Sequence, residues 1–386
     1  MFRADLTAGL IIAACFSAVA IAWLLRKAMP LSLAVPIAFL KVSLPFVYFA
    51  FFFDAQWTFL DDGVYLRHAQ DLLDHGYGPF ASLGETRFYV RLFMLSQGIH
   101  FFYTWWNLFA LWLFGPHYWA PVYLNILVSS GAVVTFSRLL SDGELPSRYR
   151  LYAVVFFALN FEILAWSSVF NLKDVLVMAL SLVALRRLLL ISAGHVRVGN
   201  VFALLGALAV LMGLRYYVPA MLVGSTCLWA LFSLRGLQRP TSTAAIVAAS
   251  LVIGGWVATH AGRSFSYLHV ENIAFGVLRF LLTPQPWSLE DNYTFLLVPS
   301  IVNWALVPLL FFGIVRLWRD VPELRLMVFY GALMAALYGI TPELNGPRER
   351  IQLIPIMSLA IFHGAYSLLA EYRASRWNGV VASAPS

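Results

Sequence analysis

The chain has 386 residues, of which 61% are hydrophobic and only 12% are charged, and its mean hydropathy is +0.77. This composition excludes a soluble globular domain and predicts a protein that crosses a membrane many times. The net charge of +7 does not indicate a nucleic-acid partner, because the basic residues stand singly or in pairs between apolar runs.

A count of roughly 20 apolar residues per crossing predicts about eleven membrane segments. We therefore expect an all-α polytopic bundle with a single domain over residues 1–376 and a short disordered tail at 377–386. Cys15 and Cys227 lie in apolar segments, so neither a disulfide nor a thiolate metal site is expected. No cleavable signal peptide is expected before Arg26 and Lys27. The segments begin near Leu6, Leu31, Trp119, Leu151, Asp174, Asn200, Tyr216, Thr241, Tyr293, Leu324 and Ile351.

The charges in the connecting loops predict the orientation. One set of alternate loops holds 15 of the 26 lysines and arginines and only five acidic residues. The positive-inside rule makes this set cytoplasmic. The N-terminus and the loop at about 54–95 are then outside, and the C-terminus is inside.

Two adjacent carboxylates, Asp61 and Asp62, follow the apolar run that ends at Phe53. A short helix is expected from Val64, because apolar residues recur at helical spacing on one face until Gly76. Either aspartate could cap this helix. Asp62 lies nearer to the helix start and is the expected N-cap, which leaves Asp61 free to act. The apolar face consists of Tyr65, Ala69, Leu72 and Leu73.

This stretch resembles the first external loop of the GT-C superfamily, the membrane glycosyltransferases that use polyprenyl-phosphate sugars, including the dolichyl-phosphate-mannose protein mannosyltransferases. The resemblance rests on an acidic pair after a membrane span, a tyrosine, and a small helix that ends in glycine. It implies an outer-face catalytic loop at about 54–95 with Asp61 and Asp62 as catalytic residues. No counterpart of the large soluble C-terminal domain of some families is expected after Arg376. The matching residues are Asp61, Asp62, Tyr65, Ala69 and Gly76.

The aromatic segment between Gly76 and Pro116 predicts one or two helices that lie along the outer surface of the membrane. The alternative is an ordinary span from about Ile99 to Phe114. That span would reverse the orientation of everything after it and remove the charge asymmetry.

The turn Asn171-Leu172-Lys173-Asp174 falls on the outer side between two segments. Asn171 is a candidate N-cap for the following helix, with Asp174 placed favourably for the helix dipole. The resemblance implies a second acidic site at this turn, which would be Asp174. The two interpretations are compatible.

An outer loop is expected at about 260–292, with an apolar stripe from Val270 to Leu281 that fits an amphipathic helix in the membrane interface. The last outer loop carries Arg348 and Arg350, against the positive-inside bias. Flanking charges that reach to water are the alternative interpretation. The fork of an arginine matches phosphate oxygens, and the resemblance agrees, so we expect a phosphate clamp here.

These residues predict a glycosyltransferase that moves sugar from a polyprenyl-phosphate donor to an acceptor hydroxyl on the outer face. The leaving phosphate needs cationic stabilisation, for which Arg348, Arg350, Lys173 and Arg215 are the candidates. The acceptor hydroxyl needs a base, which suits Asp61, and one base with direct displacement would invert the anomeric centre.

Three alternatives remain at this point: a polymerase or ligase for pyrophosphate-linked oligosaccharides, a transporter for lipid-linked sugars, and a fold of this superfamily that has lost activity. The transporter would need internal repeats and broken helices at matching positions. A divalent cation held by Asp61 and Asp62 stays open. The expected partners are a lipid-linked sugar donor, a lipid, glycan or protein acceptor, and membrane lipid, without nucleic acid.

Lys41 and Glu162 interrupt membrane segments, where isolated charges are costly. A rise of about 1.5 Å per residue places both at a similar depth. We therefore expect the two side chains to form a pair or to share one buried polar network.

Overall fold

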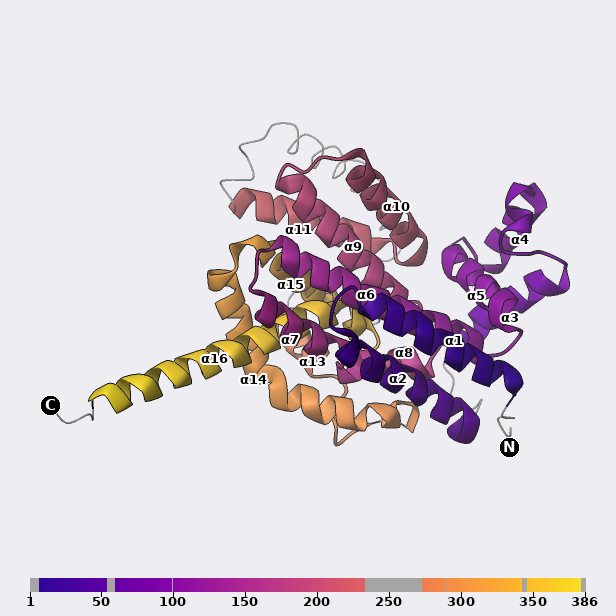
Figure 1. Cartoon of the computed structure of the whole chain (residues 1–386). Coiled ribbons are helices and arrows are strands. Elements are labelled where there is room, and N and C mark those ends of the chain that lie inside the picture. Colours follow the sequence, from indigo (N-terminus) through magenta and orange to yellow (C-terminus); the bar gives the residue numbers. More distant parts are fainter. Residues whose placement is uncertain are drawn as a thin grey trace.

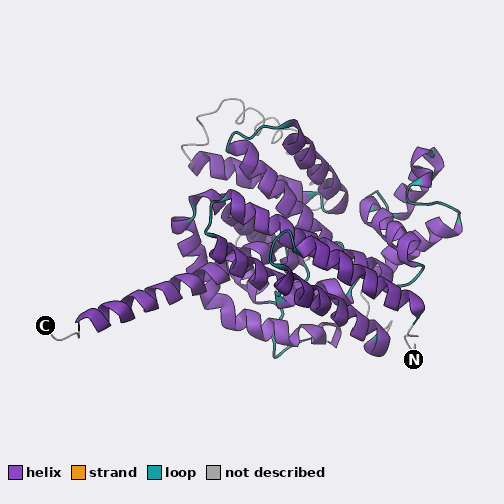
Figure 2. Ribbon diagram, viewed as in Figure 1, coloured by secondary structure: helices purple, strands orange, loops and turns teal. Residues whose placement is uncertain are grey.

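The computed structural model of the chain describes residues 7–53, 60–98, 100–232, 273–289, 291–341 and 346–382. All regular elements in these ranges are helices (Figure 2). Seven of them are long and apolar enough to cross a membrane, which confirms an all-α, multi-pass membrane protein. These spans are Ala8–Leu25 (α1), Leu31–Phe52 (α2 and η1), Trp119–Asp142 (α6), Asp174–Ser192 (α9), Tyr293–Asp320 (ending in α14, Leu297–Asp320), Pro322–Ile340 (with α15, Arg325–Ile340) and Glu349–Arg373 (with η9, Glu349–Leu353, and part of α16, Ile354–Ala382).

An eighth span is formed if α7 (Ser147–Ala158) and α8 (Phe161–Val169) are taken together, with a bend of 42° between them. Asn160 lies at the bend and caps α8, because its side-chain oxygen accepts hydrogen bonds from the backbone N–H groups of Glu162 (3.0 Å) and Ile163 (3.2 Å). The break therefore places Glu162 in the first turn of a helix that is packed inside the bundle.

Two further expected segments are shorter apolar helices, α10 (Val198–Leu214) and α11 (Tyr217–Phe232). The segment expected near Thr241 and the start of the outer loop at 260–292 lie outside the described residues. The helix expected in that loop is present as α13 (Ile273–Leu282). Its Gly276 lies in close backbone contact with Gly339 of α15, while Ile273 and Leu278 remain exposed. At the other end of the chain, α16 runs as a helix to Ala382, beyond the start of the tail that was expected to be disordered, and projects from the bundle (Figure 1).

Three shorter helices form a lobe beside the bundle: α3 (Leu60–Asp74), α4 (Thr86–Leu95) and α5 (Phe101–Phe114) (Figure 1). With 14 residues, α5 is shorter than an ordinary crossing, which speaks against a span at Ile99–Phe114. A position along the outer surface of the membrane stays a prediction. The predicted face of α3 is buried, with Ala69 and Leu72 at 0% exposure. Gly76 follows the end of α3 and has a φ of 80°. Its N–H donates to the carbonyl of Leu73, and the N–H of Tyr77 donates to the carbonyl of Leu72, which completes a C-terminal cap.

The long helices α14 and α16 approach closely at Gly313, where an added Cβ would collide with the backbone carbonyl of Ala360. Gly313→Ala is expected to destabilise the fold by about 1–3 kcal/mol, because the overpacking can be relieved only by backbone movement. Gly131→Ala in α6 is the matched control, since a Cβ there meets no atom of the described residues within 4 Å. Thermal unfolding in detergent should show a lowered midpoint for Gly313→Ala alone. Equal midpoints would contradict the close packing.

Candidate active site

Five charged side chains from four distant parts of the chain form one connected group, which we call the charged cluster. It consists of Asp61 on α3, Asp174 at the start of α9, Arg215 between α10 and α11, and Arg348 and Glu349 at η9. Asp61, Asp174, Arg215 and Arg348 were predicted from the sequence as site residues, and the fold brings all four together.

The side chains of the charged cluster alternate in sign. Arg348 donates to Asp61 at 2.9 Å and to Glu349 at 3.0 Å. Glu349 also accepts from Arg215 at 3.5 Å, and Arg215 donates to Asp174 at 2.5 Å. Charge-assisted bonds of this kind are among the stronger polar contacts in proteins.

Exposure differs along the charged cluster. The side chain of Asp61 is 45% exposed and that of Arg348 is 29% exposed, whereas the side chains of Arg215, Asp174 and Glu349 are almost completely buried. The charged cluster is therefore accessible at its Asp61–Arg348 end. An incoming anion or hydroxyl group would meet this pair first.

Asp62 differs sharply from its neighbour. It is fully buried, accepts a hydrogen bond from the hydroxyl of Tyr118, and bonds to the backbone N–H of Gly63 at 2.6 Å. The expected N-cap role is wrong, because α3 already begins at Leu60 and both aspartates lie in its first turn. Successive helical residues point about 100° apart, so Asp62 faces the interior while Asp61 stays accessible.

The backbone of Asp62 is tied to the turn that precedes α9. Its carbonyl accepts from the side-chain nitrogen of Asn171 at 3.3 Å. The expectation that Asn171 caps α9 is therefore wrong: its side chain instead joins Asp62, Asn107 (2.6 Å) and Tyr103 (2.8 Å). This network holds the Asp61 helix turn against the turn that carries Lys173 and Asp174.

Lys173 lies beside the charged cluster in a small polar group. Its ammonium nitrogen is 3.1 Å from the hydroxyl of Tyr65 and 2.9 Å from Nδ1 of His100. Burial, with a smaller contribution from the charge of Arg215, lowers the pKa of Lys173 to about 7. Burial and the nearby Lys173 lower the pKa of His100 to about 4, so the imidazole is neutral near pH 7 and one ring nitrogen can accept a hydrogen bond from the amine.

Lys173→Met is expected to flatten the pH dependence of stability between about pH 7 and pH 10. The folded chain releases this proton near the lowered pKa of about 7, whereas an unfolded chain keeps it to about pH 10.4. The unfolded state thus binds more protons in this window, so the contribution of Lys173 to the free energy of unfolding rises with pH. Between pH 7 and pH 10, the difference in thermal midpoint between the wild type and Lys173→Met should grow in favour of the wild type. The difference between the wild type and the exposed control Lys27→Met should stay constant. Parallel profiles for Lys173→Met and the wild type would contradict this.

Arg350 does not join the charged cluster. Its guanidinium binds both carboxylate oxygens of Glu162, with Nε at 3.0 Å, and donates to the carbonyl oxygens of Leu281 (2.8 Å) and Thr283. Arg350 and Glu162 are both buried. The expectation that Arg350 faces the same site as Arg348 and binds the donor phosphate is therefore not supported by its placement, because four of its five donors have protein partners.

The expected pair of Lys41 and Glu162 is also wrong. Glu162 is bound to Arg350, and Lys41 is completely buried and donates to the hydroxyl of Ser129 at 3.2 Å. The fork of arginine satisfies both oxygens of a buried carboxylate, which a lysine cannot do. Similar depth in two spans therefore did not make these side chains partners.

Two buried polar atoms in or beside the charged cluster have no hydrogen-bond partner among the described residues: Nε of Arg215 and the side-chain oxygen of Gln352. Gln352 donates weakly to Asp174, at 3.4 Å, through its nitrogen. Buried polar groups are normally paired, so unpaired atoms at this place are consistent with a ligand or water in the working protein.

Sequence reasoning missed Glu349, Gln352, His100 and Tyr118. Glu349 stands between two arginines that were singled out, and a carboxylate between two cations is the one signal that pointed to it. His100 and Tyr118 carry no such signal, because they reach the site only through the packing of α5 and α6.

The described residues offer poor support for a divalent cation site at Asp61 and Asp62. The two carboxylates face different partners, Arg348 and Tyr118. In the parts of the chain that the structure describes, no three histidine, cysteine or acidic side chains gather in a group that could hold a metal ion.

Comparisons with protein-family models, with curated proteins and with solved structures found no match for this chain.

Proposed function

We propose that this protein is a membrane glycosyltransferase that moves a sugar from a polyprenyl-phosphate donor to an acceptor hydroxyl. The observation that carries the proposal is the contact of Asp61 with Arg348, two residues 287 positions apart that meet at the accessible end of the charged cluster. The sequence resemblance to the GT-C superfamily and the placement of Lys173 and Arg215 support it.

The proposed reaction starts when the donor phosphate competes with Asp61 for Arg348. A guanidinium can bind phosphate oxygens as well as a carboxylate, so the incoming donor takes over this contact and frees the carboxylate. Asp61 then accepts the proton of the acceptor hydroxyl. The hydroxyl oxygen forms the new bond to the anomeric carbon while the bond from that carbon to the phosphate oxygen breaks. The electron pair leaves with the phosphate, next to Arg348 and the protonated fraction of Lys173.

A single base and a direct displacement would invert the anomeric centre. We further propose that the site lies on the outer face, with the N-terminus outside, the C-terminus inside and about eleven membrane segments in all. A lipid-linked sugar transporter would instead need broken helices at matching positions in two halves. Within the described ranges only one helix pair, α7 and α8, is broken, and it has no matching pair in another part of those ranges. This favours the transferase over the transporter.

Arg348→Ala is expected to weaken turnover of the donor by about 10- to 100-fold, because a charge-assisted bond is worth about 1.5–3 kcal/mol. The assay follows release of polyprenyl phosphate from lipid-linked sugars by purified protein in proteoliposomes, with heat-treated membranes of the source cells as the supply of acceptor. Arg87→Ala, an exposed arginine on α4, is the matched control and should behave as the wild type. Equal rates for both variants would remove Arg348 from the site.

A further inference from the structure

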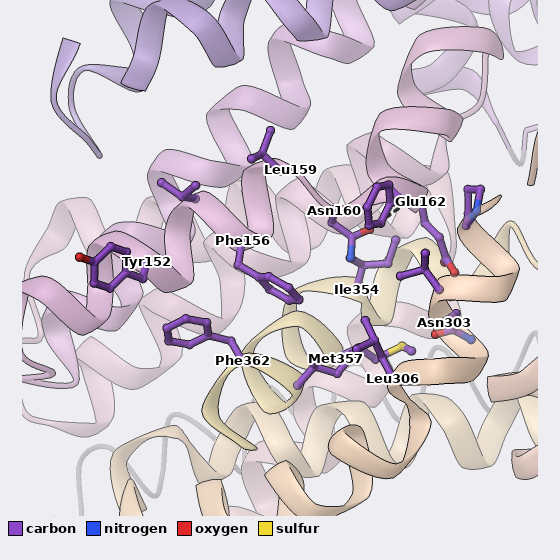
Figure 3. A pocket seen from close by; sticks show the side chains of 15 residues that line it. Tyr152, Phe156, Leu159, Asn160, Glu162, Asn303, Leu306, Ile354, Met357 and Phe362 are labelled. Atoms are coloured by element: carbon purple, nitrogen blue, oxygen red, sulfur yellow. Dashed lines mark hydrogen bonds between the residues drawn. The ribbon is translucent and has the colours of Figure 1, made fainter. Parts of the chain in front are cut away.

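Two features of the molecule have no part in the proposed reaction. One is an apolar groove of about 420 Å³ between α7, α8, α14 and α16 (Figure 3). Its polar end consists of Asn160, Glu162 and Asn303 (Figure 3). These side chains are already bonded within the protein, so the groove offers no free polar group to the reacting atoms. The other feature is the contact between Tyr118 and Asp62, which lies next to the proposed base.

Asp62 is held through both its side chain and its backbone, although the neighbouring Asp61 is accessible. Its carboxylate accepts the hydroxyl of Tyr118 and the N–H of Gly63, the latter at 2.6 Å. Its carbonyl accepts from the side chain of Asn171 at 3.3 Å. Because a planar peptide bond joins the two aspartates, the contacts that fix Asp62 also fix the backbone from which the carboxylate of Asp61 projects.

The start of α3 depends on such contacts for its position. Both aspartates lie in the first turn of the helix, where the backbone N–H groups have no carbonyl partner earlier in the helix. Tyr118 immediately precedes Trp119, the first residue of α6. Its hydrogen bond therefore connects the first turn of α3 to one of the long helices of the bundle.

The ring of Tyr118 is in turn packed against aromatic side chains at the end of the second span. Phe49 of η1 (Tyr48–Phe52) and Phe53 have ring centroids 5.9 and 5.0 Å from that of Tyr118. η1 is a single π-helical turn, a rare element that occurs frequently at functional sites. The hydroxyl of Tyr118 is thus fixed by contacts with two membrane spans.

We propose that Tyr118 is a positioning residue, which holds the carboxylate of Asp61 in place for proton transfer through its hydrogen bond to Asp62. This proposal rests on the proposed function and assigns the reaction a further residue. A displacement of about 1 Å at a reacting group can slow a reaction by about 10²-fold. The hydroxyl of Tyr118 binds the buried Asp62 and not Arg348, so its loss slows transfer without weakening the binding of the donor.

The test removes one hydroxyl group. Tyr118→Phe keeps the ring and deletes the contact with Asp62. Tyr123→Phe is the matched control, because Tyr123 is a buried tyrosine of α6 whose hydroxyl has no hydrogen-bond partner among the described residues. The full-length variants are compared in proteoliposomes, with heat-treated membranes of the source cells as the supply of acceptor. The measurements are the initial rate of polyprenyl phosphate release at saturating lipid-linked sugar, equilibrium binding of the donor, and the thermal midpoint.

Tyr118→Phe is expected to release polyprenyl phosphate about 10- to 100-fold more slowly than the wild type, with unchanged donor binding. Tyr123→Phe should match the wild type. Phe53→Leu keeps the hydroxyl but loosens the packing of its ring, and should give an intermediate rate. This variant tests the proposal even if Tyr118→Phe does not fold, since a wild-type rate for Phe53→Leu would then overturn it.

Tyr118→Phe in the background of Asp61→Asn separates positioning from a general loss of structure. A residue that acts through Asp61 has no further effect once that carboxylate is gone, so the residual rate of Asp61→Asn should stay unchanged. Equal factors of loss in both backgrounds would overturn the proposal, as would a wild-type rate for Tyr118→Phe beside an active wild type. Absence of release by the wild type would instead refute the proposed function, and the positioning role with it.

Discussion

Asp61→Asn is expected to remove most turnover, by about 10²–10⁴-fold, while the protein still folds and still binds the donor. Asparagine keeps the shape of the side chain but cannot accept the proton of the acceptor hydroxyl. Asp61 is suited to this role because its side chain is 45% exposed and contacts Arg348. The measurement is the rate of polyprenyl phosphate release, together with donor binding and the thermal midpoint.

Asp62→Asn is the matched control for this prediction. Asp62 is buried and accepts the hydroxyl of Tyr118 and the N–H of Gly63. Its replacement should therefore lower the thermal midpoint, as loss of a buried charge-assisted contact does. If Asp61→Asn retained the wild-type rate, and Asp62→Asn lost activity at an unchanged midpoint, the base would have to be Asp62.

Glu162→Gln is expected to cost about 3–5 kcal/mol of stability, because it leaves the buried guanidinium of Arg350 without its counter-charge. Arg350→Met should be similarly harmful, since it leaves the carboxylate of Glu162 unpaired. The double variant should be less destabilised than the sum of the two, because neither charge is then left alone. Unfolding in detergent measures all three.

The partly exposed pair of Arg186 and Asp142, with side chains 16% and 25% accessible, is the matched control. Arg186→Met should lose much less stability than Arg350→Met, because exposed ion pairs contribute little. Strict additivity in the Glu162–Arg350 cycle would show that the two charges are not coupled.

The sequence predicts the long helices well, because about 20 apolar residues in a row leave few alternatives in a membrane. The spacing of apolar residues also predicts the small helix that ends near Gly76, although this helix begins at Leu60 and not at Val64. Hydropathy alone also predicted spans at α10 and α11, and both are present as apolar helices that are shorter than the seven long spans.

The side-chain partners were harder to predict. Depth along the membrane normal placed Lys41 and Glu162 at one level, but it says nothing about which helices are neighbours around the bundle. Because η9 packs against α8, Glu162 forms its ion pair with Arg350, and Lys41 donates a hydrogen bond to Ser129 of α6. Charge bias in the loops likewise singled out Arg348 and Arg350 together, although only Arg348 reaches Asp61.

Sugar transfer from the natural donor pool tests the proposed transferase activity most directly. Lipid-linked sugars are extracted from metabolically labelled membranes of the cells that make this protein. They are then incubated with the wild type, Asp61→Asn or Arg348→Ala, together with heat-treated membranes of the same cells as the source of the acceptor. The wild type is expected to release polyprenyl phosphate, and both variants are expected to lose this release although Asp61→Asn still binds the donor. Intact lipid-linked sugars after incubation with the wild type, or equal release by all three proteins, would contradict the proposed activity.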